Sequence, residues 1–193
     1  MRSKHAKYNT RNPISGFLVR NFQRDIAKII SNLEFNSILD IGCGEGFLLS
    51  SMAPYIKGKR CCAIDIDENE VRDASQNLPF CEIKQGSAYE IPYENGSFEL
   101  VMCTEVLEHL EKPDLALKEI SRVSSKFVLF SVPDEPLWRI LNLARLTYLD
   151  SWGNTPGHIN HWSSAGFCKF IGSEFQLIKV IKPLPWIVIL AGK

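Results

Sequence analysis

Residues 40–46 read Asp-Ile-Gly-Cys-Gly-Glu-Gly and follow the apolar residues Ile38 and Leu39. Glycine lets the backbone turn sharply and lets a ligand approach the main chain without a Cβ in between. The apolar stretch from Phe47 to Met52 then favours a helix. A strand, a glycine-rich turn and a helix form the nucleotide-binding corner of a doubly wound α/β sheet. The segment therefore predicts a nucleotide-like ligand at the end of the first strand.

The spacing of the glycines narrows the choice of ligand. A dinucleotide fingerprint has Gly-x-Gly-x-x-Gly; Gly42 and Gly44 fit it, but Phe47 takes the third position. A P-loop needs Gly-Lys-Ser/Thr, and the sequence has no such run. Residues 40–46 closely resemble motif I of the class I S-adenosylmethionine-dependent methyltransferases. A turn without a ligand is the alternative, but a bare turn needs one glycine rather than three.

The resemblance implies how this turn would hold S-adenosylmethionine. Gly42, Gly44 and Gly46, with Cys43 between them, would let the backbone lie against the amino acid and ribose groups. Asp40 would receive the ammonium group, directly or through water. Its alternative role is to fix the turn by side-chain hydrogen bonds.

Other cofactor contacts are expected at the ends of later strands. Asp65 ends the second strand and would accept both ribose hydroxyls, as the acidic residue about 20 positions past the glycines does in dinucleotide folds. Ile66 would lie against the adenine, and Asp67 is expected to be the N-cap of the next helix. Ser87 stands where the family usually has an Asp that accepts the adenine amino group. This departure weakens the expected adenine contact.

The resemblance also places Ala88 beside the adenine site. Cys103 and Thr104 lie at the carboxyl end of the fourth strand, where the methyl group is expected.

A group of acids and histidines follows that strand. If the segment is helical, Glu105, Glu108 and His109 share one face by i, i+3 and i+4 spacing. Such a face can bind a divalent cation (Mg²⁺, Mn²⁺ or Zn²⁺) or supply a general base, for which His109 and the neighbouring carboxylates of Glu105 and Glu108 are the candidates. The two glutamates can alternatively complement the helix dipole.

The run Glu-Val-x-Glu-His resembles quinone-biosynthesis O-methyltransferases and metal-dependent enzymes that methylate small-RNA 3′ ends. In the latter, a distant histidine completes the metal site within a His-x-x-x-Trp-Ser/Thr segment. Residues 158–163 have this shape, and His158 takes the matching place. Alternatively, His158 and His161 are hydrogen-bonded loop residues.

Strand-like and helical segments alternate along the chain and predict a parallel sheet with right-handed crossovers. The expected strands are 37–41, 60–66, 81–84, 98–103, 126–132, 175–181 and 186–190, and the expected helices are 13–33, 46–53, 68–76 and 113–123. The last two strands would form a hairpin that puts one antiparallel strand into the sheet. This is a Rossmann-like, seven-stranded α/β fold in one domain, residues 1–193. Residues 13–33 and the insertion 133–172, with an expected helix at 136–148, would cap the substrate together with the aromatic residues Trp138, Tyr148 and Trp152.

Composition is ordinary for a globular protein of 193 residues. No apolar run approaches the ~20 residues of a membrane span, and the polar N-terminus lacks a secretory signal, so a cytoplasmic location is expected. The six cysteines lack a Cys-x-x-Cys pattern and are expected to be free thiols. Residues 1–30 carry seven Lys/Arg and one acid, which fits either a solvated helix face or contact with an anionic partner.

Three functions are consistent with these residues. The leading prediction is methyl transfer from S-adenosylmethionine to a small molecule, at oxygen. An RNA methyltransferase with a divalent metal is the second, although the chain has no dense basic run or separate RNA-binding module. A protein that binds the cofactor without catalysis is the third. The sequence does not indicate the acceptor or the oligomeric state.

Overall fold

The computed structural model describes residues 13–135, 137–138, 155 and 157–193. The strands are β1 (Ser37–Ile41), β2 (Arg60–Asp65), β3 (Glu82–Gln85), β4 (Phe98–Thr104), β5 (Ser124–Pro133), β6 (Gln176–Ile181) and β7 (Trp186–Gly192). The helices are α1 (Pro13–Ile30), α2 (Phe47–Ser51), α3 (Ala53–Ile56), α4 (Glu68–Asn77), the 3₁₀ helix η1 (Leu107–His109), α5 (Pro113–Val123) and α7 (Ser164–Ile171).

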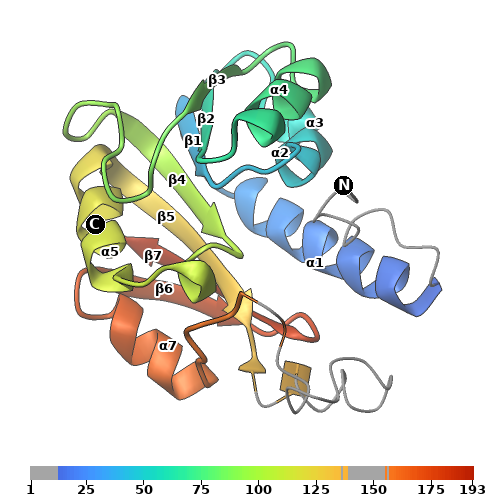
Figure 1. The fold of residues 1–193 in the computed structure, drawn as a ribbon, viewed down its shortest axis with the longest axis vertical. Helices are drawn as coiled ribbons and strands as arrows, with labels where there is room; N and C mark the ends of the chain where they lie inside the picture. Colours follow the sequence, from blue (N-terminus) through green and yellow to red (C-terminus); the bar gives the residue numbers. More distant parts are fainter. Residues whose placement is uncertain (1–12, 136, 139–154, 156) are drawn as a thin grey trace.

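The seven strands form one twisted sheet in the order β3-β2-β1-β4-β5-β7-β6 (Figure 1). The pairs from β3 to β5 are parallel, and β7 runs antiparallel to both β5 and β6. The predicted Rossmann-like, mostly parallel sheet with one antiparallel strand near the C-terminus is therefore confirmed.

Helices cover both faces of the sheet, which explains why its central strands are apolar throughout. Phe22 and Ile26 of α1 pack on one face together with Ile38 of β1. Ile120 of α5 and Phe167 of α7 pack on the other face, where the next strand residue, Leu39, also points. Successive side chains of a strand alternate between faces, so both cores draw on the same strands.

The order of the strands determines where a ligand can bind. β1 has β2 on one side and β4 on the other, so the chain changes direction across the sheet at β1. In open α/β sheets, ligands bind outside the carboxyl ends of the strands at such a switch point. The turn after β1 and the segments after β2 and β4 all lie at this edge.

Some elements differ from the sequence-based expectation. The helix expected at 46–53 is two short helices, α2 and α3, and α7 was not predicted at all. The expected helix at 136–148 lies mostly outside the described residues, as do Tyr148 and Trp152. All six cysteines are free thiols, as predicted. Among the described residues, no helix is both long and apolar enough to cross a membrane.

Candidate functional site

The glycine turn after β1 depends on backbone conformations that favour glycine. Gly42, Gly44 and Gly46 have φ of 71°, 53° and 78°. A Cβ on Gly42 would lie 2.4 Å from Cγ2 of Val106, and a Cβ on Gly46 would lie 2.6 Å from Cδ1 of Leu78. A Cβ on Gly44 would be in ordinary van der Waals contact, 3.9 Å from Oε2 of Glu70. Packing therefore excludes a side chain at the outer two glycines, whereas Gly44 is restricted by its positive φ and not by a clash.

Asp65 joins the end of β2 to this turn. Gly44 N–H donates to Asp65 Oδ2 (2.8 Å), and Asp67 N–H donates to Asp65 Oδ1 (3.0 Å). Each carboxylate oxygen keeps a second lone pair, so ribose hydroxyls can still donate to it. Asp67 in turn accepts Asn69 N–H at 2.9 Å, which confirms it as the N-cap of α4. We call residues 40–46 and Asp65 the cofactor corner.

Asp40 provides a test of whether the cofactor corner fits a ligand. Its side chain is buried, with 2% of its surface exposed, and Oδ1 has no hydrogen-bond partner among the described residues. Burial, together with the negative charge of Asp65, raises the pKa of Asp40 to about 7. A buried acceptor without a donor is costly to leave unsatisfied. An ammonium group of a bound cofactor would supply the missing donors, so the corner fits S-adenosylmethionine.

The other predicted cofactor residues are spread along the same edge of the sheet. Ile66 is 71% exposed beside Asp65, and Ser87 Oγ accepts Tyr89 N–H at 3.1 Å. Ala88 is half-buried against the core. Cys103 and Thr104 are both buried at the end of β4. Burial raises the pKa of the Cys103 thiol well above its ordinary value.

Glu105 lies outside the helix that carries Glu108 and His109, so the condition for a face shared by all three is not met. Glu105 has φ of 59°, in the left-handed region, and the 3₁₀ helix η1 begins only at Leu107. Ser131 Oγ–H donates to Glu105 Oε1 (3.1 Å) and Trp186 Nε1–H donates to Oε2 (2.8 Å). Its carboxylate therefore anchors the segment after β4 to β5 and β7.

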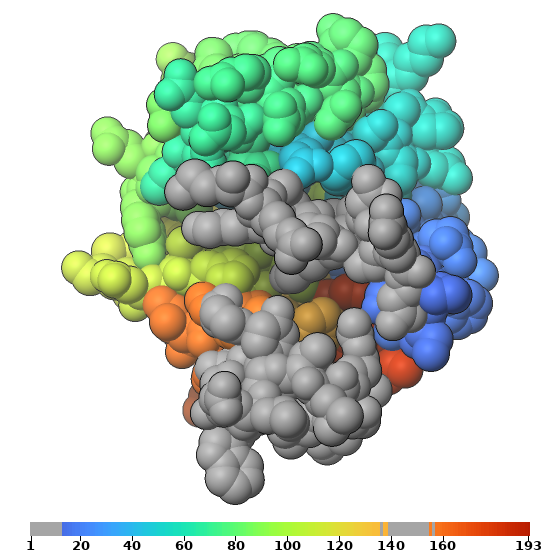
Figure 2. Space-filling view, turned by 45° about the vertical axis from the view of Figure 1, so that its right-hand side comes forward, coloured from blue at the N-terminus to red at the C-terminus, as the bar shows by residue number. Residues whose placement is uncertain are grey.

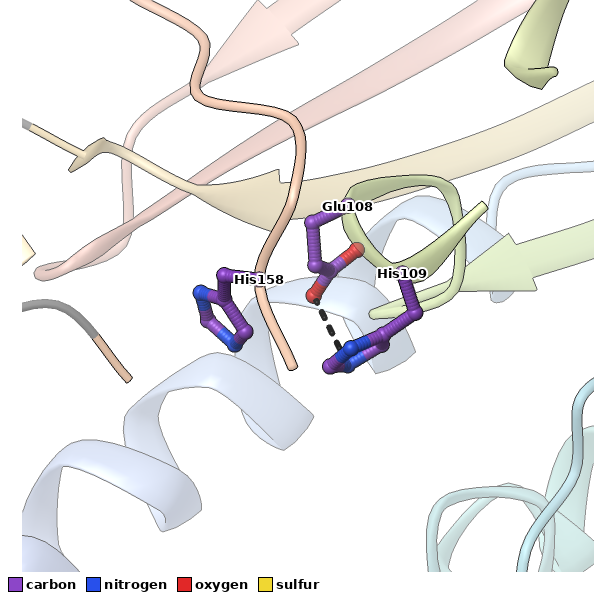
Figure 3. Close-up of side chains that lie close together, drawn as sticks. All are labelled: Glu108, His109 and His158. Atoms are coloured by element: carbon purple, nitrogen blue, oxygen red, sulfur yellow. Dashed lines mark ion pairs between the residues drawn. The ribbon is translucent and has the colours of Figure 1, made fainter. Parts of the chain in front are cut away.

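Glu108, His109 and His158 form the histidine cluster (Figure 3). One ligand atom of each lies within 4.8 Å of the others, and Glu108 Oε1 is 3.9 Å from His109 Nε2. Glu108 is fully buried, His158 is 3% exposed, and the side chain of His109 is 41% exposed. The structure thus brings together three of the four residues that the resemblance implied for a metal, and not Glu105.

Hydrogen bonds at Nδ1 fix the orientation of the His109 and His158 imidazole rings. His109 Nδ1 lies 2.8 Å from the carbonyl oxygen of Gly157, and His158 Nδ1 lies 2.8 Å from Oε1 of Glu135. Both of these oxygens accept, so each Nδ1 donates its proton, and in the neutral form of each ring the lone pair lies on Nε2. Two lone pairs and a carboxylate then face one another, an arrangement that favours a bound cation.

The loop that carries His158 is fastened to η1. The N–H groups of Ile159 and Asn160 donate to the carbonyl oxygen of Glu108 (2.9 and 3.1 Å). The Asn160 amide donates to the carbonyls of Leu107 (3.0 Å) and Leu110 (2.6 Å). Sequence analysis missed both Asn160 and Glu135, because no spacing rule connects either residue with η1.

Figure 2 shows α1 (blue), the region from β2 to α4 (cyan to green) and α7 (orange) on one face of the molecule. Asp65 of the cofactor corner ends β2, and residues 157–163 lead into α7.

Comparison with known proteins supports one family. Residues 39–128 match the model of a methyltransferase domain. A mitochondrial ubiquinone biosynthesis O-methyltransferase of Schizosaccharomyces pombe is 31% identical over 163 residues, which cover 78% of this chain and 55% of that protein. The chain spans between 26% and 55% of the length of the curated relatives it matches.

Solved structures share the fold. A Pyrococcus horikoshii protein superposes with a TM-score of 0.73 at 16% identity, covering 97% of this chain and 94% of that one. The magnesium protoporphyrin IX methyltransferase of Synechocystis, solved with bound SAH, superposes with a TM-score of 0.70 at 18% identity, covering 94% and 88%. The matched domain, the relatives and the shared fold together support a class I S-adenosylmethionine-dependent methyltransferase.

Proposed function

We propose that this chain transfers a methyl group from S-adenosylmethionine to an oxygen atom of a small-molecule acceptor. The observation that carries the proposal is the buried Asp40 carboxyl, whose Oδ1 lacks a donor among the described residues, in the glycine turn after β1. The ubiquinone biosynthesis O-methyltransferase among the relatives supports oxygen as the acceptor atom.

The residues of the cofactor corner would bind and orient the cofactor, which supplies an already activated methyl group. Asp40 would hold the ammonium group, Asp65 the ribose hydroxyls and the exposed Ile66 the adenine face. Gly44 would allow close approach of the backbone. The remaining task for the protein is to place the acceptor and to exclude water.

His109 is our candidate for the group that takes the acceptor proton. Its side chain is the most exposed of the histidine cluster, and its Nδ1 proton is held by Gly157. The unprotonated Nε2 is then available to accept a proton. The oxygen–methyl bond would form as the sulfur–methyl bond breaks, with the acceptor proton passing to this nitrogen.

Calorimetry with S-adenosylhomocysteine tests the cofactor part of the proposal. Wild-type protein should bind it, and Asp65→Ala should weaken binding by about 1–3 kcal/mol, the scale of a lost hydrogen bond to a charged group. Asp73→Ala, on an exposed position of α4, is the matched control and should leave affinity unchanged. Equal affinity of wild type and Asp65→Ala would contradict the assignment.

Labelled S-adenosylmethionine tests the transfer itself. Incubation with fractionated cell extract should place the label in a small-molecule fraction, and His109→Ala should reduce the rate without changing S-adenosylhomocysteine affinity. Label in RNA would instead support the RNA alternative. Cofactor binding without transfer to any fraction would support a non-catalytic role.

As the alternative to proton transfer by His109, we infer that the histidine cluster binds a divalent cation, because an Nε2 lone pair that ligates a metal cannot also accept a proton. The unsatisfied, buried Nε2 of His158 supports this inference, because among the described residues it has no hydrogen-bond partner. Two imidazoles and one carboxylate suit Mn²⁺ or Zn²⁺ better than Mg²⁺. Such an ion would supply positive charge beside the acceptor oxygen.

Metal titration of chelator-treated protein tests this inference. Wild type should bind Mn²⁺ or Zn²⁺, and His158→Ala should weaken binding by about 100-fold or more, beyond the loss seen for outer residues of metal sites. His161→Ala is the control, because His161 lies in the same loop but outside the cluster. Equal affinity of wild type and His158→Ala would remove the metal from the proposal.

A further inference from the structure

Glu135 is a buried acid that sequence analysis did not identify and that the proposed function does not yet use. It lies just after β5, and 3% of its surface is exposed. The backbone around it is fixed: Asp134 N–H donates to the carbonyl of Pro185 (2.9 Å), and Glu135 N–H donates to that of Trp162 (3.3 Å). Its carboxylate therefore has a defined place behind the histidine cluster.

The two carboxylate oxygens of Glu135 face two histidines of one loop. Oε1 is 2.8 Å from Nδ1 of His158, and Oε2 is 3.4 Å from Nδ1 of His161. A carboxylate oxygen at 2.8 Å accepts the hydrogen bond of an Nδ1–H group, so Glu135 keeps the His158 proton on Nδ1.

Ring contacts fix the plane of His158. Trp138 stacks on it with ring centroids 6.5 Å apart and an interplanar angle of 28°. His109 meets it edge-on, at 4.9 Å and 77°. With Nδ1 held by Glu135 and the ring held on both sides, Nε2 has one direction available, towards Glu108 and His109 (Figure 3).

We propose that Glu135 is a positioning residue, which fixes the tautomer of His158 so that its Nε2 lone pair is directed into the histidine cluster. Glu135 acts only through His158 and touches neither the acceptor nor the cofactor corner. The inference rests on the proposed function, because a directed lone pair matters to the reaction only if the cluster serves the methyl acceptor.

Nitrogen-15 NMR of the full chain with labelled histidine tests the proposal directly. The chain has four histidines, so single His→Gln variants can assign each ring. At pH 8, wild-type His158 should show the proton on Nδ1. Glu135→Leu should move it to Nε2, the form that free histidine favours. Glu135→Gln keeps the size and one acceptor oxygen, and should retain the Nδ1 proton.

Two controls separate positioning from general damage. Glu119 is a carboxylate that also accepts two kinds of hydrogen bond, from Ile91 N (3.0 Å) and Arg122 Nε (2.7 Å), but it lies on α5. Glu119→Leu should leave the His158 tautomer unchanged even where it lowers the melting temperature. S-adenosylhomocysteine affinity should stay within about twofold in all Glu135 variants, because the cofactor corner is not involved.

The outcomes are separable. A wild-type His158 with its proton on Nε2, or a Glu135→Leu spectrum identical to wild type, overturns the proposal even if the chain is a methyltransferase. If no cofactor binds, the proposed function fails while the tautomer result stands. Where transfer is measured, Glu135→Leu should lower the rate at least tenfold and Glu135→Gln should restore most of it; equal loss in both variants overturns the positioning role.

Discussion

Two buried carboxyls, Asp40 and Glu135, lie in two regions of this molecule and differ in the direction of their pKa shifts. Asp40, in the cofactor corner, has an oxygen without a donor among the described residues, and its pKa is raised to about 7. Glu135, behind the histidine cluster, faces His158 and His161, and its pKa is lowered. In the proposed function a ligand would complete Asp40, whereas Glu135 already has Oε1 bonded to His158 and Oε2 3.4 Å from Nδ1 of His161.

The two regions also differ in how they are built. The cofactor corner uses backbone turns and the ends of adjacent strands, β1 and β2. The histidine cluster joins side chains of η1 to a loop about 50 positions later, held by Asn160 and Glu135. Local sequence therefore determines the first region, whereas tertiary packing determines the second.

Replacing Gly42 with alanine should affect both regions, because Gly42 lies in the cofactor corner and contacts the segment just before the histidine cluster. The new Cβ would meet Val106, which directly precedes η1, and would also occupy a φ of 71°. Overpacking and a left-handed alanine together should lower the free energy of unfolding by about 2–5 kcal/mol. Chemical denaturation measures this. Gly58→Ala is the control, because Gly58 has φ of 82° and nothing within 4 Å of a Cβ. Equal losses of unfolding free energy in Gly42→Ala and Gly58→Ala would show that the new Cβ does not clash with Val106.

Asp40→Asn should reduce the pH dependence of stability that the raised pKa of Asp40 causes. A carboxyl whose pKa is raised on folding binds a proton that the unfolded chain releases, so stability falls as pH rises from about 4 to about 7. Asp40→Asn lacks this carboxyl, so between pH 5 and pH 8 its free energy of unfolding should fall by about 2–3 kcal/mol less than that of wild type. Urea denaturation across this range measures the difference. Parallel curves for the two proteins would mean that Asp40 is ionised throughout.

Glu105→Ala tests whether Glu105 belongs to the histidine cluster. Its removal leaves Ser131 Oγ and the buried Trp186 Nε1 without their acceptor and should cost about 1–3 kcal/mol of stability. Mn²⁺ or Zn²⁺ affinity should not change. Thermal unfolding and metal titration measure the two effects, with the exposed Glu111→Ala as control. A large loss of metal affinity at unchanged stability would show that Glu105 is a ligand of the cation after all.

Sequence analysis predicted the fold well, because its signals are local. The apolar runs at β1 and β4 and the glycines after β1 each specify their own element. It failed where tertiary contacts decide. α7 was overlooked because Ser164–Ile171 was treated as part of a long excursion, although Ser163 is its N-cap and accepts Gly166 N–H. The face shared by Glu105, Glu108 and His109 depended on a helix through Glu105, but Ser131 and Trp186 bind that residue in a left-handed turn.

The site was predictable only in part, for the same reason. Gly44 and Asp65 follow from a recognisable pattern at the ends of neighbouring strands, and the structure brings them into contact. His158 was found only through a resemblance. Nothing in the sequence around Glu135 distinguishes it from a surface acid, since its burial depends on β7 and on the 158–163 segment folding over it.

The hydrogen bonds between residues 157–160 and η1 limit how often this loop can open. Opening this loop would break six hydrogen bonds: the five made to η1 and its flanks by Ile159 N, Asn160 N, the Asn160 amide (two) and His109 Nδ1, and the one between His158 Nδ1 and Glu135 Oε1. At about 1 kcal/mol net for each, the opened form would be about 0.004% of molecules. Any step that needed this loop open would therefore start from a very small minority of molecules.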